Sequence, residues 1–172
     1  MPLHEFTLHI EPAPDDAGWD RIYEAGLDDT APEESPDGRA WLQVMRRADS
    51  MADAITSAVA QLQSAGYRAV GVDCDDFVTL TAIGQKTGRT RESVRLLATG
   101  KRGPGGFPSP VATGKHPLYS WSLVRDWFRA HFGDQSVAAG DDDADTLAAA
   151  NLLLRARLIA PDLSRLAPLV AA

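Results

Sequence analysis

The chain has 172 residues, of which 44% are hydrophobic, and a formal net charge of −7; this composition is typical of a globular protein and excludes a wholly disordered one. A single cysteine, Cys74, excludes an internal disulfide framework. The N-terminus carries no secretory signal, and no run approaches the roughly 20 apolar residues that span a bilayer, so we expect a cytoplasmic protein with no membrane partner.

The charge is unevenly divided along the chain. Residues 1–79 carry 16 acidic and 5 basic side chains, a net charge of −11, whereas residues 80–131 carry 9 basic and 2 acidic side chains, a net charge of +7. Residues 132–172 carry a net charge of −3. A basic block inside an acidic chain indicates where an anionic polymer docks, so the middle third is the candidate site for nucleic acid.

In chain order, residues 1–76 predict strands that alternate with helices. Alternating apolar residues predict a half-buried strand over 5–11, and another strand is predicted over 39–47. Residues 67–73 form an apolar run, which favours an inner position in the sheet. The acidic segment 28–38 is predicted to be a loop, with a short edge strand before it that is inferred from topology.

Two helices connect these strands. The first would bury Trp19, Ile22 and Tyr23 on one face, and the second begins at a cap on Ser50 or Asp49. The order strand, helix, strand, strand, helix, strand indicates an α+β fold that begins with a small ferredoxin-like α/β domain.

The segment "LTAIGQKTGRTRESVRLLAT", residues 80–99, fits a helix-turn-helix. Ile83 falls at a core position of the first helix, and Gly84 falls where a small residue lets the second helix cross closely. Gly88 falls in the turn, where a positive φ is needed. Thr90 then serves as the N-cap of the second helix.

The second helix, over 89–98, is the candidate recognition helix. Val94 and Leu97 face the first helix, while Arg91 and Arg95 share the outward face. There an arginine can bind a guanine edge with two hydrogen bonds or clamp a phosphate, although a solvated helix face is the structural alternative. The candidate DNA contacts on this helix are Arg89, Thr90, Arg91, Glu92, Ser93 and Arg95.

A wing is predicted after this helix, with a strand at Phe107–Val111, a tip at Thr113–His116 and a return strand at Leu118–Trp121. Glycines in the preceding loop, residues 100–106, would let backbone N–H groups approach phosphate. The loop and the tip add four candidate DNA contacts, which are Lys101, Arg102, Lys115 and His116.

The segments "LTAIGQKTGRTRESVRLLATGKRGPGGFPSPV" and "LYSWSLVRDW" together resemble the winged helix-turn-helix of the MerR/excisionase (AlpA-like) superfamily, as it occurs in actinobacterial helix-turn-helix DNA-binding proteins. The resemblance covers about residues 78–131. It implies binding of double-stranded DNA, with helix 89–98 in the major groove and the wing beside it, and it implies no catalytic activity. Metal sensing is not carried over, because the chain has one cysteine and only about 40 residues after the wing.

Residues 133–145 are predicted to be a polar linker, followed by an Ala- and Leu-rich helix and a second short helix opened by Pro161. These C-terminal helices either form the interface of a homodimer or pack onto the winged helix, and both interpretations stay open. The predicted domains are an acidic α/β domain over 1–76, a winged helix-turn-helix over 77–132, and a C-terminal part over 133–172.

The motifs of nucleotide, metal and hydrolase sites are absent from the sequence. Neither Gly100-Lys101 nor Gly114-Lys115 fits a P-loop, the four histidines lack zinc spacing, and no nucleophile elbow occurs. The aspartates at 73, 75 and 76 lack the glutamate that completes an EF-hand loop, and we interpret them as a solvated acidic turn. We therefore expect no enzymatic activity, no cofactor and no metal.

The leading hypothesis is a sequence-specific double-stranded DNA-binding protein, a transcriptional regulator that acts as a homodimer. One alternative is an excisionase-like architectural factor that bends DNA. Another is an adaptor or antitoxin whose acidic N-terminal domain binds a protein partner, since the charge of that domain would repel DNA.

Overall fold

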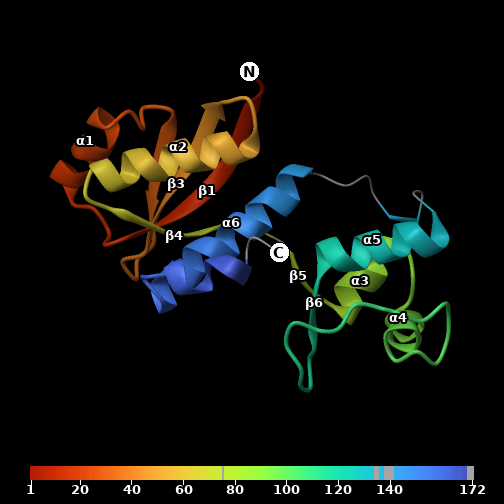
Figure 1. The fold of residues 1–172 in the computed structure, drawn as a ribbon. Helices are drawn as coiled ribbons and strands as arrows, with labels where there is room; N and C mark the ends of the chain where they lie inside the picture. The colour runs from red at the N-terminus through yellow and green to blue at the C-terminus, as the bar shows by residue number, and fades with distance from the viewer. Residues whose placement is uncertain (75, 134–135, 138–141, 170–172) are drawn as a thin grey trace. The chain divides into compact units, whose positions relative to one another are not determined.

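The computed structural model describes residues 1–74, 76–133, 136–137 and 142–169 (Figure 1). The fold is mixed α+β, with a small antiparallel sheet and several helices. The chain divides into two compact units. We name residues 1–74 with 146–172 the first unit, and residues 75–145 the second unit.

The first unit is built on four strands, which are β1 (Leu3–Glu11), β2 (Thr30–Glu34), β3 (Ala40–Arg47) and β4 (Arg68–Val72). They lie in the order β2-β3-β1-β4, and every pair of neighbours is antiparallel. The alternation predicted over 5–11 is confirmed, because Phe6, Leu8 and Ile10 of β1 are all buried.

Two details of this sheet differ from the sequence-based expectation. The strand β4 lies at an edge of the sheet, so the inner position predicted for residues 67–73 is wrong. The inferred second strand is β2, which lies within the segment 28–38 that the sequence predicts to be a loop. Pro32 and the acidic residues of β2 suit an exposed sheet edge, because proline has no N–H to offer a further strand.

Helices α1 (Asp16–Glu24) and α2 (Met51–Ser64) pack on the sheet, and their ends are capped by side chains. The Asp15 carboxylate accepts a hydrogen bond from Gly18 N at 2.8 Å, and Ser50 Oγ accepts one from Asp53 N at 3.1 Å. The inward face predicted for the first helix is wrong at Tyr23, which is 64% exposed.

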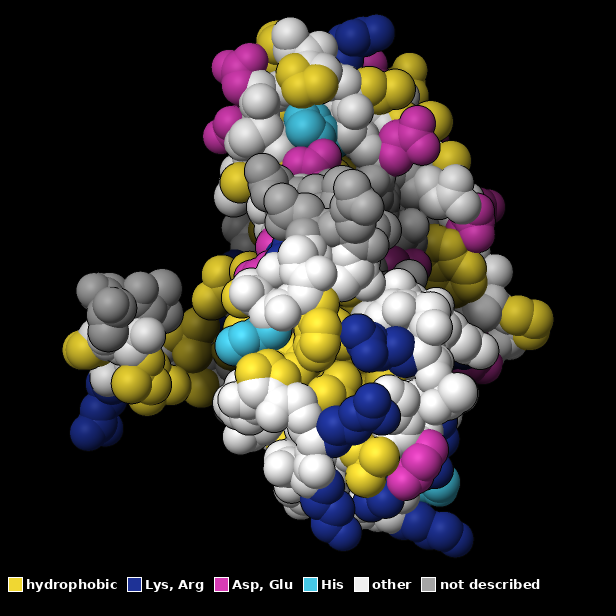
Figure 2. All heavy atoms as spheres, turned by 90° about the vertical axis from the view of Figure 1, so that its right-hand side faces the viewer, with side chains coloured by type: hydrophobic (Ala, Val, Ile, Leu, Met, Phe, Trp, Pro, Cys, Tyr) yellow, Lys and Arg dark blue, Asp and Glu magenta, His cyan; other side chains and the backbone are white. Residues whose placement is uncertain are grey.

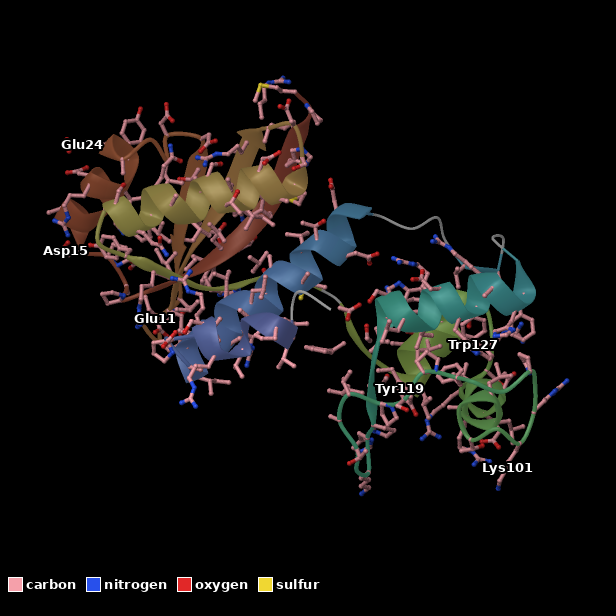
Figure 3. All side chains as sticks on the ribbon, in the orientation of Figure 1. Glu11, Asp15, Glu24, Lys101, Tyr119 and Trp127 are labelled. Carbon is pink, nitrogen blue, oxygen red and sulfur yellow. The ribbon has the colours of Figure 1, made fainter. Side chains whose placement is uncertain are left out.

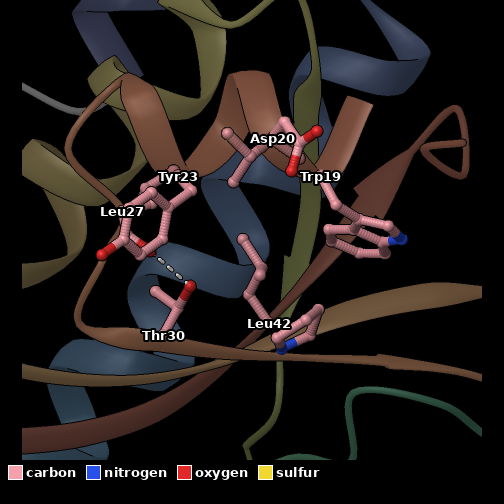
Figure 4. A pocket seen from close by; sticks show the side chains of 8 residues that line it. Trp19, Asp20, Tyr23, Leu27, Thr30 and Leu42 are labelled. Atoms are coloured by element: carbon pink, nitrogen blue, oxygen red, sulfur yellow. Dashed lines mark hydrogen bonds between the residues drawn. The ribbon is translucent and has the colours of Figure 1, made fainter. Parts of the chain in front are cut away.

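Tyr23 instead lines a shallow pocket between α1 and β2 (Figure 4). Among its lining residues, Thr30 Oγ1 donates a hydrogen bond to the carbonyl oxygen of Leu27 at 2.7 Å. The pocket is lined by Trp19, Asp20, Ile22, Tyr23, Leu27, Thr30, Pro32 and Leu42.

Helix α6 (Asp142–Ile159) belongs to the first unit from residue 146 onward. Its Leu154 is buried in the same core as the sheet residues. Asn151 Oδ1 accepts a hydrogen bond from Val72 N at 3.1 Å, and Asn151 Nδ2 donates one to Cys74 Sγ at 3.4 Å. One backbone donor of the edge strand β4 is therefore satisfied by a helix side chain.

The C-terminal part thus packs in a way that the sequence does not indicate. Residues 146–159 belong to the same unit as the N-terminal strands, which differs from the predicted packing onto the winged helix. The alternative interpretation, a dimer interface, stays a prediction. The second predicted helix is a 3₁₀ helix, η2 (Ser164–Leu169), and does not begin at Pro161. Among the helices within the described ranges, none is long and apolar enough to cross a membrane.

The second unit contains the strands β5 (Phe77–Thr79) and β6 (Leu118–Ser120) and the helices α3 (Leu80–Thr87), α4 (Arg91–Ala98) and α5 (Trp121–Phe132). The two strands pair antiparallel, with Val78 opposite Tyr119. All three helices contribute to one core, whose buried members include Val78, Leu80, Ile83, Val94, Leu97, Tyr119, Val124, Trp127 and Phe128.

Asp76 joins the start of β5 to the start of α5. Its carboxylate accepts hydrogen bonds from Ser120 Oγ at 2.7 Å and from Ser122 N at 2.8 Å, and its carbonyl oxygen accepts one from Trp121 N at 2.6 Å. The first N–H groups of a helix have no acceptor within the helix, so Asp76 acts as a cap from outside. The interpretation of Asp76 as part of a solvated acidic turn is wrong.

We predict that Asp76→Ala lowers the free energy of unfolding by about 1–2 kcal/mol, because it removes the cap of α5. Chemical denaturation followed by circular dichroism measures the change. Asp73→Ala is the matched control, since Asp73 is exposed and its carboxylate contacts His9 in the first unit; we expect a change below about 0.5 kcal/mol. Equal effects of the two variants would contradict the capping role.

Candidate nucleic-acid interface

Helices α3 and α4 approach each other closely at Gly84. A Cβ atom on Gly84 would lie 2.7 Å from the carbonyl oxygen of Arg89, a separation that real side chains do not adopt. Gly88 ends α3 with φ 66° and ψ 24°, in the left-handed region that glycine adopts without steric cost. The predicted roles of both glycines are confirmed.

Helix α4 is fixed along one side and open along the other. Thr90 Oγ1 accepts a hydrogen bond from Ser93 N at 3.1 Å, as predicted for the N-cap. Val94 is 0% exposed and Leu97 is 4% exposed, which confirms their predicted inward orientation. Arg91, in the first turn, is exposed.

Glu92 and Arg95 form an ion pair on the surface of α4. Arg95 Nε lies 2.8 Å from Glu92 Oε2, and Arg95 Nη2 lies 2.6 Å from Glu92 Oε1. This double hydrogen bond lowers the pKa of the Glu92 carboxyl below its usual value and raises the pKa of the Arg95 guanidinium. Arg95 is therefore half-buried and engaged with a carboxylate, whereas Arg91 is exposed.

Two further cations lie over aromatic rings of α5. The Arg89 guanidinium carbon is 4.5 Å from the ring centroid of Phe132 and 5.5 Å from that of Phe128. Lys86 Nζ is 5.2 Å from the ring centroid of Trp121. Such contacts restrict a cationic side chain without removing its charge. Sequence reasoning missed Lys86, because the ring that holds it is far away along the chain and no local pattern indicates the contact.

The loop after α4 is fastened to the end of that helix. The N–H groups of Lys101 and Arg102 both donate to the carbonyl oxygen of Leu96, at 3.0 Å and 3.2 Å. These two N–H groups are therefore already bonded within the protein. The prediction that N–H groups of the 100–106 loop approach phosphate is wrong for these two. The side chains of Lys101 and Arg102 are exposed.

The first strand of the predicted wing, at Phe107–Val111, does not form. Residues 107–111, all of them described, contain no strand. Phe107 is instead drawn into the core, where its ring centroid lies 4.9 Å from that of Trp127 in an edge-on arrangement. Trp127 Nε1 also donates a hydrogen bond to the carbonyl oxygen of Gly105 at 3.0 Å. The segment after the loop is thus held by α5 rather than by a partner strand.

The segment between Val111 and Leu118, where the sequence predicts the tip of a wing, is closed by backbone hydrogen bonds. Val111 N donates to the carbonyl oxygen of Leu118 at 2.8 Å, and Leu118 N donates to that of Ala112 at 3.0 Å. The return strand is β6, and it ends at Ser120 because Trp121 already begins α5. Lys115 and His116, at the predicted tip, are both exposed.

Arg125 is one of the basic residues of the block 80–131, but its side chain does not contribute to the charge of the surface. It is 6% exposed, and its Nη2 lies 2.8 Å from Asp145 Oδ2 and 3.0 Å from Asp126 Oδ1. The contact with Arg125 lowers the pKa of the Asp145 carboxyl. A positive charge counted from the sequence is therefore neutralised inside the second unit.

The exposed cations gather near α4 and the segments that follow it. Figure 2 shows Lys and Arg side chains collected over the lower part of this face, with few acidic side chains among them. In Figure 3, Lys101 extends away from the loop after α4, whereas Tyr119 and Trp127 lie on β6 and α5, in the core. Of the residues predicted from the sequence, the exposed charged or ionisable ones are Arg91, Glu92, Lys101, Arg102, Lys115 and His116.

A scan against models of protein families and searches of curated proteins and of solved structures found no match to this chain. Within the part of the chain that the structure describes, no group of three or more His, Cys, Asp or Glu residues is arranged to hold a metal ion. Function is therefore inferred from the geometry of α3, α4 and the cations around them.

We predict that the carboxyl pKa of Glu92 lies below 4.5, its ordinary value, and rises toward that value in Arg95→Ala. A carboxyl with a lowered folded pKa stabilises the fold above its unfolded pKa, and this contribution is lost as pH falls through the folded value. An NMR titration of the Glu92 side chain measures the pKa. Arg91→Ala, which removes a weaker electrostatic partner, should shift it less; an unchanged pKa in Arg95→Ala would show that the pair does not form in solution.

Proposed function

We propose that the second unit is a winged helix-turn-helix of the MerR/excisionase kind, and that the protein is a sequence-specific double-stranded DNA-binding protein that regulates transcription. In this proposal α4 enters the major groove, and the turn closed between Val111 and Leu118 lies against the adjacent backbone or minor groove. The first unit is proposed to be ferredoxin-like, which the strand order β2-β3-β1-β4 supports.

One observation carries the proposal. Helix α4 is held against α3 at Gly84 and through Val94, while Arg91 in its first turn is exposed. A recognition helix needs this combination, because its N-terminal residues must reach base edges from a rigid support. An arginine in that position can donate two hydrogen bonds to O6 and N7 of guanine.

Arg95 has a different role in the proposal. Its guanidinium is already oriented by the two hydrogen bonds to Glu92, so part of its side-chain entropy is lost before DNA arrives. The pair can contact a phosphate through the remaining N–H groups of Arg95, while the carboxylate of Glu92 disfavours a second phosphate nearby. We therefore assign base readout to Arg91 first and orientation on the backbone to Arg95.

The exposed cations after α4 supply the sequence-independent part of binding. Lys101, Arg102 and Lys115 are exposed and flank the recognition helix in the chain. Lysine and arginine contacts to phosphate release counterions, so they make affinity fall with salt without selecting a sequence.

The test of base readout begins with selection of a preferred duplex from a random library by the purified full chain. Arg91→Ala is expected to cost about 1–3 kcal/mol of binding free energy on the selected duplex and to relax selectivity at one base position. Arg68→Ala is the control, because Arg68 is exposed in the first unit with only a 4.0 Å contact to Glu11. Failure to select any duplex, or equal affinity of Arg91→Ala and wild type, would contradict the proposal.

The backbone contacts make a separate prediction. Lys101→Ala is expected to weaken binding to selected and unrelated duplexes by similar factors, and to reduce the slope of log affinity against log salt by about 1. Fluorescence anisotropy at several salt concentrations measures both quantities. A loss confined to the selected duplex would assign Lys101 to a base instead of a phosphate.

A further inference from the structure

The pocket between α1 and β2 has a volume of about 210 Å³. Three of the residues that line it, Ile22, Leu27 and Leu42, are apolar and at most 2% exposed. Pockets that take drug-sized ligands have volumes of roughly 300–1,000 Å³. The size of this pocket therefore suits a smaller molecule, and its buried lining suits one that carries apolar groups.

Two aromatic side chains of α1 also line the pocket. Figure 4 shows the rings of Trp19 and Tyr23 at opposite ends of it, with Leu42 between them. Tyr23 is 64% exposed, so most of its ring remains open to a ligand. The face of an aromatic ring attracts a cation that lies within about 6 Å of the ring centroid.

Two side-chain donors of the pocket are already used within the protein. Trp19 Nε1 donates a hydrogen bond to Glu34 Oε1 at 3.1 Å, and Thr30 Oγ1 donates one to the carbonyl oxygen of Leu27 at 2.7 Å. An indole and a hydroxyl each have a single hydrogen to donate. An anionic ligand would need such donors, so their engagement disfavours an anion in this pocket.

The charge around the pocket favours a cation. Asp20 lines the pocket, and its carboxylate has no hydrogen-bond or ion-pair partner among the described residues. Residues 15–34 carry eight acidic side chains and one basic side chain. The basic one, Arg21, donates a hydrogen bond to the hydroxyl of Tyr67 at 2.8 Å, and no lysine or arginine is among the described residues that line the pocket.

We propose that this pocket binds a small organic cation, an alkyl-substituted ammonium ion. Its charge lies near the Asp20 carboxylate, and its alkyl groups lie against Leu42 and the rings of Trp19 and Tyr23. A hydrated inorganic cation is a poor fit, because apolar side chains cannot replace the oxygen ligands that such an ion requires. The inference goes beyond the proposed DNA binding and does not depend on it, since it concerns the first unit and is tested without DNA.

The exposure of the pocket sets the expected affinity. Asp20 and Tyr23 are both exposed, and solvent weakens ion pairs and cation–aromatic contacts at exposed sites. We therefore expect a dissociation constant of roughly 1 mM for a simple alkylammonium ion.

The first test is an NMR titration of the full chain with choline and with n-butylammonium, at constant ionic strength. The indole N–H resonance of Trp19, assigned by its loss in Trp19→Phe, reports binding. We expect a saturable shift with at least one of the two cations. The neutral alcohol 3,3-dimethyl-1-butanol has the shape of choline without its charge, and we expect it to bind at least about tenfold more weakly than choline if choline binds. No saturable shift with either cation up to about 50 mM, or equal binding of choline and the alcohol, would overturn the proposal.

The second test assigns the binding to the pocket. Asp20→Asn and Tyr23→Leu are each expected to raise the dissociation constant of the cation at least about threefold. Both residues are exposed, so the fold is retained, which the NMR spectrum of each variant verifies. Glu24→Gln is the matched control, because it removes the same charge from the same helix at an exposed residue outside the pocket lining. Equal effects of Asp20→Asn and Glu24→Gln would show attraction by the acidic surface as a whole and overturn the proposed site.

Discussion

The contact between Gly84 and the carbonyl oxygen of Arg89 constrains the whole second unit. At 2.7 Å there is no space for a side chain at position 84, so α4 keeps its place on α3 only while this residue is glycine. A displaced α4 would withdraw Val94 and Leu97 from the core. A second close approach holds the loop beyond α4, because a Cβ on Gly103 would clash with Leu97. The direction in which Arg91 points therefore follows from one missing Cβ atom.

The cations of the second unit fall into groups that a count of charges does not distinguish. Arg125 forms a buried ion pair with Asp145, and Arg95 forms an ion pair with Glu92 at the surface. Arg89 lies over the rings of Phe128 and Phe132. An arginine side chain of this unit is thus buried in an ion pair, held in one orientation by a contact, or exposed and able to bind an anion, depending on its neighbours in the fold. For the proposed binding of DNA this division matters, because oriented cations lose less entropy on binding.

The two helices α3 and α4 and the turn between them could be predicted from the sequence because their constraints are local. Gly84, Gly88 and Thr90 act on residues within a few positions of themselves, so their spacing carries the information. The errors concern contacts between distant segments. Asp76 caps a helix more than 40 residues away, and Phe107 leaves the wing for a ring on α5. Neither partner is visible in a local pattern.

The position of β4 illustrates a further limit of sequence patterns. An apolar run indicates that both faces of a strand are buried. It does not indicate whether a further strand or a helix lies along the edge of that strand. Here the cover at the edge includes α6, which follows β4 after the entire second unit. Periodicity alone likewise misplaced Tyr23, which the helical pattern groups with Ile22 but which is 64% exposed in the fold.

Different features limit the pairing of a further strand at the two edges of the four-stranded sheet. In β2, Pro32 lacks a backbone donor, whereas the edge of β4 is occupied by Asn151. A chain ending before residue 146 would lose Asn151 and Leu154 together, leaving an unpaired strand beside an opened core. Such an edge is a template for pairing with the same strand of another molecule. The C-terminal helix therefore also protects this protein against intermolecular strand exchange and aggregation.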